Sequence, residues 1–220
     1  MSLKLIITGS SGMVGEGVLR LCLAHPDVGK ILSISRRATN LSDPKLKEII
    51  HQNFFDLSPI ENQLIGFDAC FYCIGVTSLL IKESEYYDIT HNMTLSIAKK
   101  LVSLNSEMIF CYISGFGANS NSKIMQTRIK GVTEVDLFKT SFKKVYSFRP
   151  GLLKPLRGQT HIQKVYYLLN PFYPIFRFLF PGFVLSLNEL GQAMINSVTM
   201  GYEKQILEVK DILALNRTIN

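Results

Sequence analysis

The sequence lacks several features that would identify whole classes of protein. It has no run of five charges of one sign, no internal repeat and no low-complexity segment, which excludes charged tails and repeat architectures. Its basic residues form no stripe, which argues against RNA binding. No HxH or HxxxH pair occurs among His25, His51, His91 and His161, so no metal site is predicted.

Cysteine is also scarce. The four cysteines, Cys22, Cys70, Cys73 and Cys111, all lie in apolar surroundings. Cys70 and Cys73 have CxxC spacing, but in a predicted strand an offset of three puts the two thiols on opposite faces. We therefore expect reduced core thiols and neither a disulfide framework nor a shared metal. The N-terminus enters a β-like run without a basic flank and long apolar region, so a cytoplasmic protein is expected.

An uninterrupted apolar span is missing as well. Residues 165–187 carry one charge, Arg177, and would be long enough to cross a bilayer. Three prolines, Pro171, Pro174 and Pro181, argue against a continuous spanning helix, because each removes a backbone donor and obstructs the preceding turn. The segment is interpreted as core packing or a substrate lid; contact with a membrane surface or a second copy stays open.

What the sequence does contain is enough apolar material for one large core. Of its 220 residues 47% are hydrophobic and 19% charged, with 8 prolines, as is typical of globular proteins. This length predicts one domain over residues 1–220, of which 151–220 form the substrate or lid portion. Lys and Arg number 24 against 17 Asp and Glu, and the formal charge of +7 favours anionic partners such as nucleotide phosphates.

Apolar runs of strand length alternate with segments of helical periodicity. This order predicts an α/β fold, a Rossmann-type doubly wound parallel sheet with a small C-terminal lid region. Several strands are almost continuously apolar, as expected when helices cover both faces. Strands are predicted over 3–8, 30–35, 48–54, 68–75, 107–114 and 144–150, and helices over 14–25, 83–105 and 186–201, with another starting within 123–134.

The strongest functional signal is "LIITGSSGMVGEGVL", residues 5–19. Gly9, Gly12 and Gly15 have GxxGxxG spacing, directly after a strand and before a helix. Such glycines permit a tight turn and a close approach to a pyrophosphate, whose charge then meets free amides and the positive end of the helix. The predicted cofactor-binding residues of this cradle are Thr8, Gly9, Ser11, Gly12, Met13, Val14 and Gly15.

The end of the second strand indicates which dinucleotide is bound. An NAD site commonly has a carboxylate there, whereas "SISRRATN" has Arg36 and Arg37, whose guanidinium groups suit a 2′-phosphate. NADP is therefore favoured over NAD, although both arginines would also be ordinary surface residues. Asp56, followed by Leu57, is a candidate for the adenine amino group or a turn residue. Gly75 is either a point of close cofactor approach or a turn residue.

Together these stretches resemble the short-chain dehydrogenase/reductase superfamily, in its atypical, epimerase-like branch. "TGSSGMVG", "YISGFG", "RIKG" and "FRPG" carry the resemblance, which covers residues 3–151 well and the rest loosely. The nearest subgroup comprises bacterial nucleoside-diphosphate-sugar epimerase-like and Tat-interacting oxidoreductase-like proteins. The resemblance implies Ser114 as the residue that holds the substrate oxygen and Lys130 as the ribose-binding lysine. Each also has a plain alternative, a strand-end cap for Ser114 and a solvent-facing helical residue for Lys130.

At the position of the family's catalytic tyrosine the chain has Gln126, four residues before Lys130. An amide does not exchange protons usefully near neutral pH, although it can hydrogen-bond a carbonyl. Tyr112, Tyr166, Tyr167 and Tyr173 are the other phenols considered as donors, and Tyr112 is expected in the core. We expect an NADP(H)-binding oxidoreductase-like protein for an unidentified small carbonyl or alcohol compound, with impaired acid/base chemistry. The alternative is a non-catalytic NADP(H)-binding sensor or scaffold.

Overall fold

Seven parallel strands form the centre of the protein in this computed structural model, which describes residues 2–76, 81–162, 166 and 170–217. The strand order is β3-β2-β1-β4-β5-β6-β9, and every neighbouring pair is parallel. The predicted doubly wound Rossmann-type sheet is thus confirmed. The strands are β1 (Leu3–Thr8), β2 (Val28–Ser35), β3 (Leu46–Ile50), β4 (Ala69–Tyr72), β5 (Ile109–Ile113), β6 (Lys144–Arg149) and β9 (Ile206–Glu208).

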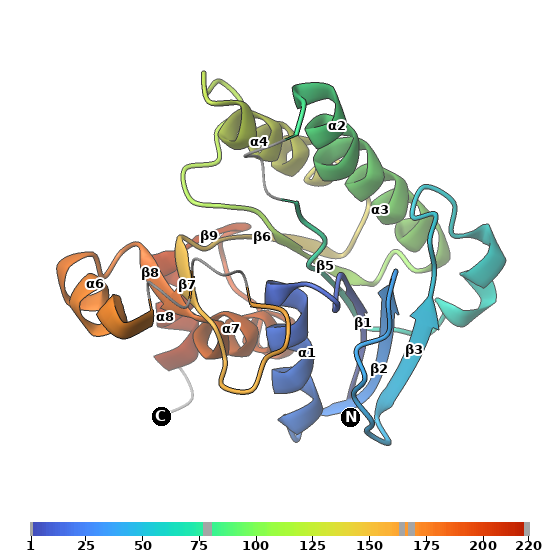
Figure 1. The fold of residues 1–220 in the computed structure, drawn as a ribbon. Helices are drawn as coiled ribbons and strands as arrows, with labels where there is room; N and C mark the ends of the chain where they lie inside the picture. The colour runs from blue at the N-terminus through green and yellow to red at the C-terminus, as the bar shows by residue number, and fades with distance from the viewer. Residues whose placement is uncertain (1, 77–80, 163–165, 167–169, 218–220) are drawn as a thin grey trace.

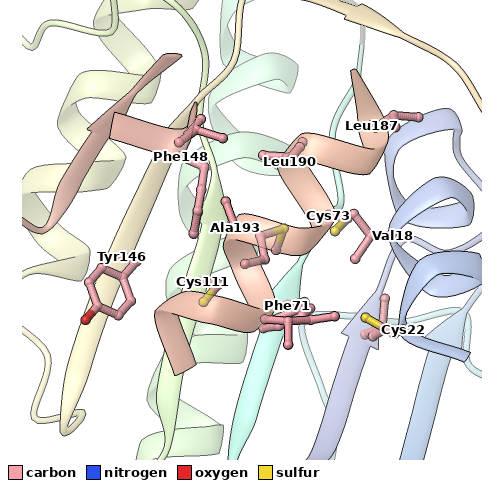
Figure 2. Close-up of a cluster of buried hydrophobic side chains, with 14 of the residues drawn as sticks. Val18, Cys22, Phe71, Cys73, Cys111, Tyr146, Phe148, Leu187, Leu190 and Ala193 are labelled. Carbon is pink, nitrogen blue, oxygen red and sulfur yellow. The ribbon is translucent and has the colours of Figure 1, made fainter. Parts of the chain in front are cut away.

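Helices cover both faces of the sheet, which explains why its inner strands are apolar on both sides (Figure 1). One layer contains α1 (Met13–Ala24), α7 (Leu187–Thr199) and α8 (Val209–Arg217). The other contains α3 (Met93–Leu104) and α4 (Met125–Leu137), with the short 3₁₀ helix η1 (Ser58–Gln63). Figure 2 shows the first core, where side chains of α1 and α7 pack onto the sheet.

The cysteines lie as the strand period predicts. Cys70 belongs to one core cluster and Cys73 to the other, so their thiols lie on opposite faces of the sheet. All four cysteines are buried and free, and burial raises the pKa of each thiol. These residues are core components without a reactive thiolate.

The helix predicted over 83–105 is one continuous helix that a π-helical turn interrupts. It consists of α2 (Glu83–Tyr87), a π-helical turn η2 (Asp88–Asn92) and α3. The hydroxyl of Thr94 donates to the Thr90 carbonyl at 2.7 Å, which satisfies an acceptor within the widened turn. The predicted helix over 186–201 is α7, and a reciprocal capping box between Ser186 and Glu189 starts it.

The C-terminal portion adds a second, two-stranded parallel sheet. β7 (Leu152–Lys154) pairs with β8 (Val184–Ser186), and between them lie η3 (Asn170–Phe172) and α6 (Tyr173–Leu179). α6 contributes no buried residue, so core packing does not account for its apolar sequence. A helix long and apolar enough to cross a membrane is absent from the described ranges.

Candidate functional site

The loop between β1 and α1 lies at the carboxyl end of the sheet, where the strand order reverses between β1 and β4. Gly9 has φ +71°, and a Cβ on it would lie 2.8 Å from backbone atoms of Cys73 and Ile74. A Cβ on Gly15 would lie 2.2 Å from the Gly9 carbonyl oxygen. Both positions require glycine because the protein's own backbone fills the space.

Gly12 is different from these two glycines. A Cβ on it would meet only the Gly9 carbonyl oxygen, at 3.4 Å, an ordinary contact, and its φ of −107° suits any residue. Its amide donates to that same oxygen at 2.9 Å, and Gly12 is the N-cap residue of α1, without a side-chain cap. The fold therefore leaves room for a side chain at the start of the helix, where a bound phosphate would need that room.

A cavity of about 260 Å³ opens at this loop. Six of the predicted cofactor residues line it: Gly9, Ser11, Gly12, Arg36, Arg37 and Gly75. Sequence reasoning missed the rest of the wall, which is mostly apolar and includes Ser35, Gln52, Phe54, Cys73, Ile74, Val76, Ile89 and Met93. In the part of the chain that the structure describes, no carboxylate lines the cavity.

Arg36 and Arg37 follow β2 directly, and both are exposed. Their backbone is fixed, because the Gln52 side-chain amide donates to the Arg36 carbonyl at 2.9 Å and the Ser35 hydroxyl to the Arg37 carbonyl at 2.5 Å. Within the described ranges neither guanidinium forms an ion pair with a carboxylate. The loop thus holds two positive groups at the cavity without neutralising them.

The other predicted cofactor residues lie outside the cavity wall. The Thr8 hydroxyl is buried with no hydrogen-bond partner among the described residues, and Met13 and Val14 pack against the first core. Asp56 accepts a hydrogen bond from the Ser58 amide at 2.9 Å, and hydrogen bonds from Ser58 lower the pKa of Asp56. Leu57 is buried in the second core. Asp56 thus has the geometry of a turn residue, one of the two alternatives that the sequence left open.

Ser114 and Lys130, which the family resemblance singled out, come together in space. The Lys130 ammonium donates to the Ser114 carbonyl at 2.5 Å and passes over Gly115. Burial lowers the pKa of Lys130 to about 8, although nearby Glu134 opposes this effect. The Ser114 hydroxyl is buried, with no hydrogen-bond partner in the described part of the chain. Neither Ser114 nor Lys130 is among the residues that line the cavity at the glycine loop, and a buried hydroxyl without a partner is a feature that calls for an explanation.

Gln126 lies in the first turn of α4, one turn before Lys130, and is exposed. Among the tyrosines considered, Tyr112 is buried in the second core, as expected. Tyr166 is half-buried, and Tyr173 has the Lys154 ammonium 4.6 Å from its ring centre. Tyr167 lies outside the described residues.

Glu16 of α1 connects that helix to the C-terminal portion of the chain. Its buried carboxylate accepts hydrogen bonds from the backbone amides of Thr160 and His161, both at 3.0 Å, and from Arg20 Nε at 2.9 Å. Burial alone would raise the pKa of Glu16, but these hydrogen bonds outweigh it and lower the pKa from 4.5 to about 2. The Glu16 carboxylate therefore holds the segment after β7 beside the glycine loop.

Replacing Glu16 by glutamine tests this fastening. We expect Glu16→Gln to lower the free energy of unfolding by about 2 kcal/mol at neutral pH, because hydrogen bonds to a charged group are lost. A pKa depressed by folding stabilises the protein above the unfolded value of 4.5, and this contribution disappears as the pH falls through about 2. Urea denaturation at several pH values should show the difference closing over that window. Glu61→Gln, at a surface pair with Lys100, is the control and should cost under about 0.5 kcal/mol.

Comparisons with known proteins give curated proteins of similar sequence and solved structures of similar fold. No family model matches the sequence. Among curated proteins it is similar to the mitochondrial protein FMP52 of Candida albicans, 26% identical over 159 residues, covering 70% of this chain and 69% of that protein. It is also similar to FMP52 of Candida glabrata, 29% identical over 71% of this chain and 66% of that protein.

The structural neighbours share the fold. A short-chain dehydrogenase/reductase from Saccharomyces cerevisiae aligns with a TM-score of 0.71 at 12% identity, covering 98% of this chain and 99% of that one. UDP-glucose 4-epimerase from Thermotoga maritima, solved with UDP-glucose, aligns with a TM-score of 0.68 at 13% identity, covering 99% and 82%. The fold is thus that of the short-chain dehydrogenases and epimerases, as the sequence resemblance implied.

One expectation from the sequence is wrong. The relatives from Candida and from Aspergillus terreus are named as mitochondrial proteins, which overturns the expected cytoplasmic location. The expectation rested on the absence of a secretory pattern at the N-terminus, and that absence does not distinguish the cytoplasm from another intracellular compartment.

Proposed function

We propose that the chain binds NADP(H) in the cavity between β1, β2 and β4. Three features that meet in one cavity carry this proposal: the glycine loop, two guanidinium groups and, among the described residues, the absence of any carboxylate from the cavity wall or from an ion pair with either guanidinium. The loop amides and the N-terminus of α1 would hold the pyrophosphate. Arg36 and Arg37 would hold the 2′-phosphate, which favours NADP over NAD. Several structural neighbours are solved with NAD bound, which supports a nicotinamide cofactor of this kind.

We propose further that the chain is an oxidoreductase for a small apolar carbonyl or alcohol compound. A bound NADP(H) would supply or accept the hydride. Ser114 would hold the substrate oxygen with its hydroxyl, which has no hydrogen-bond partner among the described residues, and Lys130 would place a positive charge beside it. Apolar side chains lie close by: Phe116 is half exposed, and its ring meets that of Phe183 at 5.0 Å. Nucleotide-sugar recognition would instead need polar groups there.

Gln126 favours a second candidate, an NADP(H)-binding sensor or scaffold without turnover. Losing a general acid typically costs about 10² to 10⁴ in rate. A protein that keeps the cofactor cavity and lacks the donor would still change its stability and surface when the cofactor binds. The two candidates share the cofactor site and differ only in turnover.

The cofactor proposal is tested by thermal shift and by substitution of the two arginines. NADPH is expected to raise the melting temperature of the wild-type chain more than NADH does. Arg36→Gln combined with Arg37→Gln should weaken NADPH binding about 100-fold or more and leave NADH binding nearly unchanged, because two charge-assisted contacts of at least about 1.5 kcal/mol each are lost. Lys47→Gln, an exposed cation on neighbouring β3, is the control. Equal weakening for both cofactors, or no shift with either, would contradict the proposal.

A further inference from the structure

Six large apolar side chains on and beside α6 are exposed to solvent. We call them the α6 patch: Phe172, Ile175, Phe178, Leu179, Phe180 and Phe183. Their exposed fractions run from 39% for Phe183 to 85% for Phe178. α6 lies at the outer edge of the molecule, beyond β7 and β8 (Figure 1). Since α6 has no buried residue, the folding of this chain does not explain why the helix is apolar.

The charged residue of α6 is turned towards the protein. Arg177 donates to the Val184 carbonyl at 2.7 Å, and its guanidinium pairs with the Glu189 carboxylate at 2.7 and 3.1 Å. Ile175, Phe178 and Leu179 follow the three- and four-residue spacing of one helix face. The ion pair therefore fixes the rotation of α6, so that this face points to solvent without a charge of its own.

The chain segment that carries the patch has charges of one sign. From Pro150 to Asn188 the sequence contains four basic residues, Lys154, Arg157, Lys164 and Arg177, and no Asp or Glu. Lys154 and Arg157 are exposed, and within the described ranges neither forms an ion pair with a carboxylate. Lys154 instead lies over the ring of Tyr173, the first residue of α6. Positive charge thus borders the apolar face and is not neutralised.

We propose that the α6 patch docks on the surface of an anionic lipid bilayer. Aromatic and aliphatic side chains would enter the headgroup region, while Lys154 and Arg157 would contact lipid phosphates and carboxylates. A second copy of the chain fits this face less well. In a two-fold dimer the same basic border would face itself, and the segment has no carboxylate to pair with it. This inference does not depend on the proposed cofactor or reaction.

Vesicle flotation with the full chain tests the docking. Wild-type protein is expected to float with vesicles of phosphatidylcholine and phosphatidylserine, less with phosphatidylcholine alone, and less at high salt. Phe178→Ser combined with Leu179→Ser should reduce binding at least about tenfold, because two exposed apolar anchors are removed. Lys154→Gln combined with Arg157→Gln should reduce it about 25-fold on anionic vesicles, at about fivefold per basic residue.

Two matched controls distinguish binding by the α6 patch from nonspecific adsorption to vesicles. Ile65→Ser removes an apolar side chain that is 57% exposed in the loop after η1, and Lys47→Gln with Lys123→Gln removes two exposed charges elsewhere. Both should bind vesicles like wild type, and all variants should keep the wild-type melting temperature because the changed residues are exposed. Absence of wild-type flotation, or equal flotation of the α6 variants, would overturn the proposal. So would a patch-dependent dimer that does not bind vesicles.

Discussion

Replacing Gly15 by alanine is expected to lower the melting temperature by roughly 6 to 12 °C and to abolish the stabilisation by NADPH. The new Cβ would lie 2.2 Å from the Gly9 carbonyl oxygen and 2.6 Å from its carbon, distances that force the loop or α1 to move. Overpacking against backbone costs about 3 kcal/mol, which corresponds to this shift in a chain of this size. Thermal denaturation with and without NADPH measures both effects.

Gly12→Ala is the matched control for this substitution, since it adds the same methyl group to the same loop. Its Cβ would make only an ordinary contact at 3.4 Å, so the protein without cofactor should keep its melting temperature. If a pyrophosphate lies against the start of α1, the methyl group should weaken NADPH binding about tenfold or more. A Gly12→Ala protein that binds NADPH like wild type would contradict the proposed place of the pyrophosphate. A stable Gly15→Ala protein would contradict the close packing of the loop.

The sequence predicted those parts of the fold in which local pattern and tertiary packing agree. β1 and β6 begin within a residue of their predicted positions because both are apolar runs that helices cover on two faces. β9, only three residues long, was not predicted as a strand. Its pairing with β6, through Ser147, Phe148 and Arg149, joins segments about sixty residues apart, and no local pattern encodes that contact.

The candidate site also has a part that the sequence predicted and a part that it did not. The glycine loop was predictable because its spacing has a mechanical reason, which the close approach of Gly15 to Gly9 now shows. Gln52, Phe54 and Met93 were not predicted as cavity wall, since the loop after β3 and the start of α3 meet only in the folded protein. Asp56 shows where local chemistry is ambiguous: a turn residue and an adenine acceptor have the same sequence pattern.

Replacing Gln126 by tyrosine is expected to raise NADPH-dependent reduction of small aldehydes about 10² to 10⁴-fold, if the rest of the site is assembled for turnover. The phenol would lie one helical turn before Lys130. A free phenol has a pKa of about 10, and a nearby cation lowers it towards the working pH. Oxidation of NADPH with a panel of aldehydes and ketones, measured as a function of pH, gives the rate and the titration of the new donor.

Gln126→Phe provides the matched control, because it adds the same ring without the hydroxyl. It should leave activity at the wild-type level, so that any gain in Gln126→Tyr belongs to proton transfer and not to a change in packing. Combining Gln126→Tyr with Lys130→Met should remove most of the gain and raise the apparent pKa of the remaining activity, since the cation beside Ser114 is gone. If Gln126→Tyr binds NADPH normally but reduces no more substrate than Gln126→Phe, the Ser114 and Lys130 pair does not form a working reductase site. The sensor or scaffold function then becomes the better account, because its cofactor cavity lies between β1, β2 and β4 and does not depend on Gln126.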